Sequence, residues 1–539
     1  MSPPPGEVAV VGMACIFPQA PNLGAFWENI LGQVDAITDP PDDWGADLVF
    51  DPESQANDRI YTKRGGFLAE LSRFNSLEYG VMPREVEGGE PEHFLALQVA
   101  QEALKDAGYL SRPFPRERTQ VILGRGTYIN RGYVSILQHG LVVDQTIRLL
   151  ARLHPEHSRE ELESIRAELK ASLPPFNAET APSLAHSVMC GRIANRLDLM
   201  GPAFTVDAAC ASSLIAVDLG IKDLLNDSCD VALTGGVQVS TTFPISQLFC
   251  QLGALSRKGQ LRPFHAEADG TLLGEGVGIV VLKRLGDARR DRDRIYAIIK
   301  TVGVASDGKA MGVLAPRVEG EVLAMRRAYQ ARGIPPESIG VLEAHGTGTP
   351  IGDATEIEAL TRIFGERNGD FPSCALGSVK SMIGHCIPAA GIAGFIKVAL
   401  SLYHKVIPPT LHCDSPNPAL NRTPFYLNPE PRPWIHCGVE PRRAAVSAFG
   451  FGGINSHAIL EEVPEEPPVN LHGHWDSEVF VLAADSLREL VQRGKQLRRL
   501  LAGDPTFALR ELAYTAEQPD QGKSDIPPLD RRRLVWRIG

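Results

Sequence analysis

Hydrophobic residues along the chain fall into short blocks that alternate between strand-like and helix-like spacing. Val8–Met13 is a continuous apolar run of strand length. Similar runs recur at Asp230–Gly235, Val277–Leu282, Tyr296–Val302, Ile339–Glu343, Cys374–Leu376 and Ala444–Ser447. Segments with helical periodicity lie between them and include Leu23–Leu31 and Glu92–Gly108. This alternation predicts an α/β fold in which buried sheets are covered by helices.

A further helix is predicted from a start signal rather than from periodicity alone. Ser158 with Glu161 forms a capping-box pattern, and apolar residues follow on one face at Leu162, Ile165 and Leu169. The stretch His139–Ser183 around this signal is therefore expected to be largely helical.

Composition changes sharply near residue 462. We expect one large domain over 1–462, an acidic proline-rich linker over 463–476, and a small α/β segment over 477–539. The last segment has a strand at Val479–Ala483, helices at Leu487–Leu501 and Phe507–Tyr514, and an apolar piece at Leu534–Ile538. At about 60 residues it is at the low end of domain size, so we expect it to be the front of a domain that is cut short.

Charge and cysteine usage exclude several classes of protein. The net charge of -11 disfavours nucleic acid as a partner. An acidic partner would need a local basic run, for which Arg257–Arg262 and Arg289–Arg294 are candidates, although such runs are usually ordinary solvated faces. The apolar runs that we identify are strand-sized, below the roughly 18 residues of a membrane span. The amino end lacks a basic, apolar signal, and we expect a cytoplasmic protein.

Nine cysteines are present without a Cys-x-x-Cys pair, which favours reduced thiols over a disulfide scaffold or a structural zinc site. One of them, Cys210, follows the apolar strand that ends at Val206 and precedes a helix, with alanine and serine on both sides. A sulfur at the start of a helix is exposed to the positive end of the helix dipole, which favours the thiolate. A buried structural cysteine is the alternative interpretation.

Two histidines share a setting that other histidines lack. His345 ends a strand and is followed by Gly346-Thr347-Gly348-Thr349, and His385 follows Lys380-Ser381-Met382-Ile383-Gly384. Glycine-rich backbone of this kind is typical of loops shaped around a ligand. A lone histidine is more often a satisfied core group, but two beside a helix-initiating cysteine favour a catalytic site.

A fourth segment, Val446–Asn455, is a glycine-rich turn after a strand. It lacks the phosphate-binding Gly-x-x-x-x-Gly-Lys-Ser/Thr pattern. Its exposed backbone N–H groups are better suited to stabilising a developing oxyanion.

Together these four segments resemble the β-ketoacyl synthases of the thiolase superfamily, specifically ketosynthase domains of type I polyketide synthases. The resemblance runs from Val8 to about Leu460 and includes Arg262-Pro263-Phe264 and Gly274-Glu275-Gly276. It implies a thiolase-like fold of two similar halves, with stacked mixed five-stranded sheets covered by helices. The segment 477–539 resembles the start of the linker that joins a ketosynthase to an acyltransferase.

The resemblance also implies roles for individual residues. Cys210 would carry the acyl chain, and His345 and His385 would promote decarboxylation of a malonyl-type extender and stabilise its enolate. The backbone N–H groups of Cys210 and Phe451 would form the oxyanion hole. The other implied site residues are Lys380 paired with Asp353 and Glu356, the supporting Thr347 and Thr349, and Phe451 with Phe449 as a gate to the acyl pocket.

The resemblance further implies an acyl carrier protein as partner, acyl and malonyl-type thioesters as substrates, a homodimer, and an acyltransferase domain that follows in the parent chain. No cofactor of its own is expected, because the phosphopantetheine arm belongs to the carrier protein. Met382 and Cys386 differ from the asparagine and threonine of many modular ketosynthases, and His139–Ser183 is longer than usual. Both features resemble iterative ketosynthases, such as those that make enediyne polyenes or polyunsaturated fatty acids.

Three alternatives stay open. A thiolase would need a second cysteine in the glycine loop, and Phe449–Asn455 contains none. A non-catalytic scaffold that only recruits carrier proteins is compatible with filled catalytic positions. A metal hydrolase has histidines and cysteines available, but we find no metal-ligand spacing to support one.

Overall fold

A computed structural model of the chain describes residues 6–87, 89–126, 131–178, 181–239, 241–309, 312, 314–367, 371–436, 440–464, 478–484, 486–502 and 532–538. The chain divides into two compact units, Met1–Pro464 and Glu465–Gly539. Each unit is described by itself below.

The first unit is built on one large mixed sheet with eleven strands among the described residues. Five strands come from the first half of the unit, in the spatial order β3-β2-β4-β5-β1. They are β1 (Val8–Ile16), β2 (Thr119–Gly124), β3 (Ala203–Val206), β4 (Val231–Gln238) and β5 (Gly276–Arg284). The second half contributes β6 (Ala297–Ser306), β7 (Ile339–Glu343), β8 (Cys374–Gly377), β12 (Arg443–Gly450) and β13 (Ile454–Glu461).

The two halves repeat the same strand arrangement. In the second half the order is β8-β7-β12-β13-β6, with β10 (Phe425–Leu427) added at the outer edge. In the first half, β3–β2 and β2–β4 pair parallel, whereas β4–β5 and β5–β1 pair antiparallel. In the second half, β8–β7 and β7–β12 pair parallel, whereas β12–β13 and β13–β6 pair antiparallel. Antiparallel pairing of Val8–Val10 with Ala297–Ile299 joins the halves. The predicted two similar halves are therefore confirmed, and they join edge to edge into one continuous sheet.

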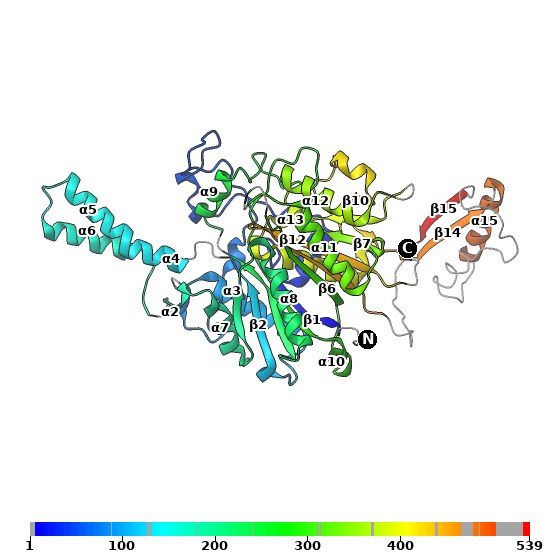
Figure 1. Cartoon of the computed structure of the whole chain (residues 1–539), viewed down its shortest axis with the longest axis horizontal. Coiled ribbons are helices and arrows are strands. Elements are labelled where there is room, and N and C mark those ends of the chain that lie inside the picture. The colour runs from blue at the N-terminus through cyan, green and yellow to red at the C-terminus, as the bar shows by residue number, and fades with distance from the viewer. Residues whose placement is uncertain are drawn as a thin grey trace. The chain divides into compact units, whose positions relative to one another are not determined.

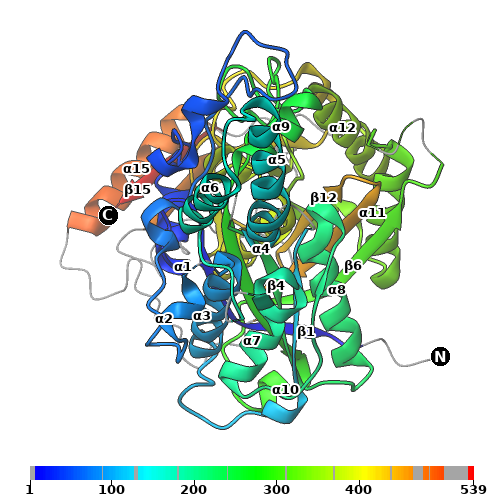
Figure 2. The same ribbon diagram turned by 90° about the vertical axis from the view of Figure 1, so that its left-hand side faces the viewer.

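Helices cover the strands in layers. The outer helices of the first half are α3 (Pro91–Asp106) and α7 (Ser187–Leu197), and those of the second half are α11 (Val318–Arg332) and α12 (Pro350–Phe364). Figure 2 shows the first pair to one side of the strands and the second pair to the other. The helices α8 (Ser212–Leu225) and α14 (Ala390–His404) contact each other and strands of both halves, so they form the middle layer. The remaining short elements are α1 (Leu23–Leu31), α2 (Pro83–Val86), α9 (Phe243–Gln251), α10 (Leu285–Arg290), α13 (Lys380–Ile383), β9 (Val406–Ile407) and β11 (Arg432–Pro433).

The middle helix α14 is more apolar than the sequence analysis recognised. The stretch Ile387–His404 is long and apolar enough to pass for a membrane span by length and composition. However, 89% of this stretch is buried within the protein, which is typical of a core helix. Its apolar character is explained by contacts with sheet strands on both sides.

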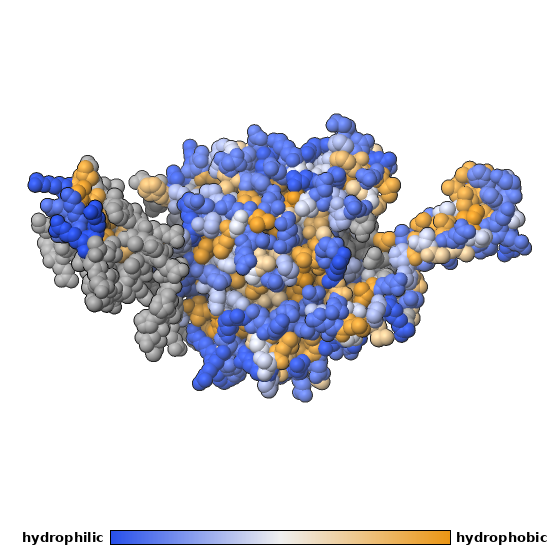
Figure 3. All heavy atoms as spheres, turned by 180° about the vertical axis from the view of Figure 1, so that it is seen from behind, coloured by the Kyte–Doolittle hydropathy of each residue, from blue (hydrophilic) through white to orange (hydrophobic). Residues whose placement is uncertain are grey.

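A helical hairpin interrupts the first half between β2 and α7. It contains α4 (Arg131–Ile136), a π-helical stretch (Leu137–Val142), α5 (Val143–Leu153) and α6 (Arg159–Ala171). In Figure 1 α5 and α6 extend away from the sheet, and Figure 3 shows apolar and polar residues side by side on the hairpin's surface. The predicted capping box is confirmed, since the Ser158 side chain accepts from the Glu161 N–H and the Glu161 side chain accepts from the Ser158 N–H.

The second unit is described only in part. β14 (Glu478–Ala484) pairs antiparallel with β15 (Arg532–Ile538), and α15 (Leu487–Ala502) packs on β14. Its buried residues are Phe480, Leu482, Ala484, Leu490 and Leu497. The predicted strand and first helix are confirmed, whereas the helix predicted at 507–514 and most of the predicted linker 463–476 lie outside the described residues.

Candidate active site

Cys210 lies on a sharp turn between β3 and α8. Ala209 adopts a positive φ of 49°, a conformation that most residues avoid. The turn is held by two hydrogen bonds, from the Ala209 N–H to Asp207 Oδ1 at 3.0 Å and from the Ala208 N–H to Ser212 Oγ at 2.8 Å. Small residues permit this packing, because a Cβ added at Gly450 would lie 2.5 Å from the Ala208 carbonyl oxygen.

The structure brings the cysteine and both predicted histidines together. His385 Nε2 lies 3.1 Å from Cys210 Sγ, within hydrogen-bond distance. The rings of His345 and His385 meet edge to face with centroids 5.4 Å apart. The chain around His385 is fixed by a hydrogen bond from its N–H to the Leu272 carbonyl at 2.7 Å. Cys210 and the two histidines thus come from different halves of the unit.

The prediction that Cys210 is poised as a thiolate was wrong. Burial raises the pKa of the Cys210 thiol to about 11, although the positive charge of Lys380 and backbone N–H groups act in the opposite direction. The free-energy cost of removing a charged sulfur from water exceeds the stabilisation that the start of the helix provides. A thiol of this kind needs a base to accept its proton, and His385 is in contact with it.

Both imidazoles are held neutral. Burial is the main cause that lowers the pKa of His345 and of His385 well below the usual value, and Lys380 lowers both further. Nδ1 of each ring has no hydrogen-bond partner among the described residues. A neutral imidazole has one N–H donor and one acceptor, so it can accept a proton or donate a hydrogen bond.

The ion pairs expected for Lys380 are not formed. Within the described residues its ammonium group makes no ion pair with Asp353 or Glu356; its largest electrostatic interactions are with Glu343 and then Glu356, beyond contact distance. Asp353 instead accepts the N–H groups of Phe264 and Gly348 at 2.6 and 3.1 Å.

Glu356 accepts the N–H groups of His345 and Gly346, both at 2.8 Å. The two carboxylates therefore shape the loop that carries His345. Burial raises the pKa of Glu356 to about 7 and that of Asp353 to about 8.

The glycine loop lines the same pocket as the two histidines. Backbone N–H groups of Phe451 and Cys210 both interact favourably with the Cys210 sulfur, which places two donors at one point. The Phe451 side chain is 38% exposed and stacks on Phe249 with centroids 5.7 Å apart. Phe449 is buried, and its ring lies beside that of His345 with the centroids 5.6 Å apart.

A pocket of about 440 Å³ connects these groups to the surface. Cys210, His345 and His385 lie on its wall, as do Thr347 and Thr349, whose hydroxyl oxygens are 3.0 Å apart. Exposed side chains on the same wall mark its mouth, and they are Leu252, Leu314, Ile351 and Phe451. The cysteine is 3% exposed, so a substrate reaches it only through this pocket.

Sequence reasoning missed three polar residues of the pocket wall, Asp307, Glu321 and Asn455. Asn455 Nδ2 donates to Asp307 Oδ1 at 2.7 Å, and the Asp307 N–H donates to the Gly453 carbonyl at 2.8 Å. Acidic residues at the start of a helix are ordinary on surfaces, so the pattern around Glu321 carries no signal of burial.

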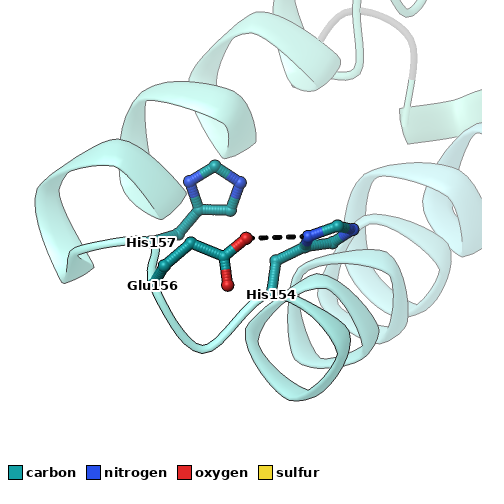
Figure 4. A group of neighbouring side chains, drawn as sticks. All are labelled: His154, Glu156 and His157. Atoms are coloured by element: carbon teal, nitrogen blue, oxygen red, sulfur yellow. Dashed lines mark hydrogen bonds and ion pairs between the residues drawn. The ribbon is translucent and has the colours of Figure 1, made fainter.

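The sequence analysis also missed a group of three neighbouring residues, of types that can ligate a metal, in the loop of the helical hairpin. Ligand atoms of His154, Glu156 and His157 all lie within 4.8 Å of one another, and His154 Nδ1 is 3.0 Å from Glu156 Oε1 (Figure 4). These side chains are 52%, 66% and 35% exposed. They belong to the loop between α5 and α6 and line no part of the pocket around Cys210.

The two basic runs considered for docking are largely compensated. Lys258 and Arg262 lie near Glu267 and Asp269, with Lys258 Nζ 2.9 Å from Glu267. Arg290 contacts Asp287 and Asp291, and Arg294 contacts Asp106. Neither run presents a simple positive surface.

Comparisons with known proteins agree with this geometry. The β-ketoacyl synthase N-terminal domain matches residues 6–288, and the C-terminal domain of the same family matches residues 296–414. The chain is 35% identical over 95% of its length to polyketide synthase PksL of Bacillus subtilis. It is 36% identical over 90% of its length to one component of the polyunsaturated fatty acid synthase of Thraustochytrium. It spans only 11% and 17% of these two relatives.

Solved structures give the same result. The ketosynthase from module 6 of the bacillaene synthase of Bacillus subtilis is 34% identical, with a TM-score of 0.71, and the match covers 95% of this chain and 80% of that one. An oxazolomycin ketosynthase domain of Streptomyces albus is 30% identical with a TM-score of 0.72, covering 95% and 83%. With its catalytic-type cysteine and histidines assembled in one pocket, the chain belongs to the β-ketoacyl synthase family and is a ketosynthase of the polyketide synthase type.

Proposed function

We propose that this chain condenses an acyl group held on Cys210 with a malonyl-type extender, with loss of carbon dioxide. The observation that carries the proposal is the 3.1 Å contact between Cys210 Sγ and His385 Nε2, beside His345, in a pocket of about 440 Å³. This arrangement supplies a nucleophile, a base and two hydrogen-bond donors to one reacting centre.

In the first half-reaction the acyl group moves to the enzyme. His385 Nε2 accepts the thiol proton, and the sulfur attacks the thioester carbonyl of the incoming acyl chain. The N–H groups of Cys210 and Phe451 stabilise the tetrahedral oxyanion; loss of one such donor typically costs roughly 3 kcal/mol. The bond to the departing thiolate then breaks, and that thiolate takes the proton from His385. The acyl-cysteine and a free thiol on the carrier remain.

In the second half-reaction the extender enters the same pocket. His345 and His385 donate hydrogen bonds to its thioester carbonyl, and the carbon–carbon bond to the carboxylate breaks to release carbon dioxide. The resulting enolate carbon attacks the acyl-cysteine carbonyl and expels the Cys210 thiolate, which takes up one proton from solvent and regenerates the thiol. The positive charge of Lys380, which acts on both histidines and on Cys210, favours the negative charge that develops here.

Intact mass spectrometry tests the proposal in two steps. The chain is incubated with an acyl thioester, and we expect one acyl adduct on Cys210. A malonyl thioester is then added, and we expect the adduct to disappear as a β-ketoacyl thioester forms. The Cys210→Ala variant should form no adduct, and its condensation should fall at least about 10³-fold.

Other outcomes would favour the alternatives. Absence of an adduct in the wild type would support a scaffold that only recruits carrier proteins. Efficient condensation of acetyl-CoA without a malonyl donor would support a thiolase.

The partners follow from the chemistry. We propose that an acyl carrier protein delivers both thioesters on its phosphopantetheine arm, because a buried cysteine at the end of a pocket requires a long tether. Such a delivery would take place in the cytoplasm, as the sequence predicts. Phe451, at the mouth and stacked on Phe249, would gate the acyl pocket.

A homodimer is proposed from the open edge of the sheet. β3 is the last strand of the eleven, pairs on one side with β2, and leaves Phe204 37% exposed. Edge strands with apolar side chains readily pair with another chain. We propose that two copies pair through β3.

Residues 477–539, within the second unit, are proposed to begin the linker that joins a ketosynthase to an acyltransferase. Support comes from their antiparallel strand pair covered by α15, which is separate from the condensing unit. The iterative type suggested by Met382, Cys386 and the long hairpin stays a prediction.

A further inference from the structure

Glu321 is a buried acid in the wall of the pocket, and the described residues give one of its oxygen atoms no partner. It lies in the first turn of α11, is 2% exposed, and forms part of the pocket wall that also contains Cys210. Its Oε2 atom has no hydrogen-bond partner among the described residues. A buried polar atom without a partner typically costs about 1–3 kcal/mol, and in a pocket this cost points to a ligand that supplies the missing bond.

The surroundings of Glu321 favour its neutral form. Burial raises the pKa of this carboxyl well above its usual value, and Glu356 and then Asp307 raise it further. A protonated carboxyl group has one O–H donor and retains acceptor capacity. Glu321 therefore offers a donor and an acceptor side by side, as an amide does.

Glu321 shares the pocket with the cysteine. The pocket wall includes Leu314, Ala315, Pro316 and Glu321, of which Leu314 is exposed and Glu321 is buried. Thr347, Thr349 and Asn455 line the same pocket. What passes along this wall in each half-reaction is the arm that carries the thioester, and a pantetheine arm contains two amide groups.

We propose that the Glu321 carboxyl group forms a hydrogen bond with an amide of the pantetheine arm and thereby positions the thioester at Cys210. The two groups are complementary, because a carboxyl O–H can donate to the carbonyl of such an amide. Glu321 is a positioning residue that touches the substrate's tether and takes no part in bond making. The inference rests on the function proposed above.

The experiment compares two thioesters of the same acyl group. One is the pantetheine thioester, and the other is a butyl thioester that lacks both amides. The rate of acylation of Cys210 is followed by intact mass for the wild type and for Glu321→Ala. We expect KM for the pantetheine thioester to rise about three- to tenfold in the variant, which is the range for one hydrogen bond. The butyl thioester should react equally with both proteins.

Two further variants separate recognition from folding. Glu321→Gln keeps a donor and an acceptor in the same place, so its KM should stay within about twofold of the wild type. Glu319→Ala changes the same helical turn, but Glu319 is 55% exposed and does not line the pocket, so both thioesters should react as in the wild type. The melting temperature of Glu321→Ala should not fall, because a desolvated acid without a partner is removed.

The results that would overturn the inference are specific. An equal loss for both thioesters in Glu321→Ala would show a structural role or a contact with the acyl group, and unchanged kinetics with both would show no role. If the wild type acylates Cys210, the proposed function stands whatever the variant does. If the wild type is acylated by neither thioester, the proposed function itself fails and the inference fails with it.

Discussion

At the scale of single residues, the site combines a thiol that does not readily ionise with two neutral imidazoles. The Cys210 thiol has its pKa raised to about 11 by burial, while the pKa values of His345 and His385 are lowered by the same cause. Burial therefore suppresses charge on all three groups before a substrate binds. In the proposed mechanism, reactivity therefore depends on the contact between Cys210 and His385 rather than on a thiolate that is present before the substrate binds.

Replacing His385 by alanine should expose this dependence. At pH 7 we expect alkylation of Cys210 by iodoacetamide to slow by about 10²–10⁴, the usual contribution of a general base. Below the raised thiol pKa the thiolate fraction grows with pH, so the variant's rate should increase about tenfold per pH unit. Alkylation followed by mass from about pH 7 to 9.5 checks this, with His404→Ala as a control, since His404 stacks on Trp27 instead. A variant that reacts as fast as the wild type at pH 7 would contradict the assigned base.

Much of the residue-level site was predictable, and what was missed has a physical reason. Cys210 and His345 follow strands, and all three site residues, His385 included, precede small residues, a local pattern that can be read directly from the sequence. The raised pKa of the thiol could not be predicted, because its burial depends on packing with Phe249, Leu273 and Ile387, which are distant in sequence. The burial of Glu321 could not be predicted from the sequence either, because it also depends on packing.

At the scale of elements, glycine decides how closely the nucleophile's helix approaches the sheet. Gly124 ends β2, and a Cβ there would lie 2.5 Å from the backbone of Ser212 and Ser213 at the start of α8. The strand and the helix are therefore in backbone contact at the point where Cys210 is positioned. Single elements such as Leu23–Leu31 and Ile339–Glu343 were predicted to the residue because their patterns are local.

Gly124→Ala should displace the first turn of α8. Overpacking of this kind costs about 1–3 kcal/mol of stability, and we expect acylation of Cys210 to slow with it. Gly191→Ala is the matched control, since Gly191 lies in helix α7 with open space around it. That change should leave acylation unaltered and raise stability by up to about 1 kcal/mol. Thermal unfolding and intact mass measure both effects, and equal behaviour of the two variants would refute the role of Gly124.

At the scale of the whole molecule, the order of the strands could not be read from local pattern. β12 lies between β7 and β13, and β4 lies between β2 and β5, so each half depends on pairings between distant segments. The duplication was expected only through the resemblance to a family. The hairpin between β2 and α7 was expected to be helical, but its π-helical stretch was not predicted, since a single turn of that kind leaves no periodic signal.

The open strand β3 yields a prediction about assembly. Phe204→Lys places a charge on the exposed edge, and we expect the proposed dimer to weaken at least about tenfold, because a desolvated lysine opposes strand pairing. Phe371→Lys is the control, as Phe371 is 84% exposed and lies away from β3 in sequence. Sedimentation over a range of concentrations distinguishes the two. A dimer unaffected by Phe204→Lys would place the interface elsewhere.

The repeated strand order has one further consequence. The sulfur is mounted on the first repeat, and both imidazoles are mounted on the second, so the reaction centre exists only at the seam between them. Either repeat, produced as a separate polypeptide, should be inactive. The first would contain the thiol without a neighbouring base, and the second would contain the two imidazoles without a thiol. The proposed bond formation therefore depends on the contact between the two repeats, which are joined by the short pairing of Val8–Val10 with Ala297–Ile299.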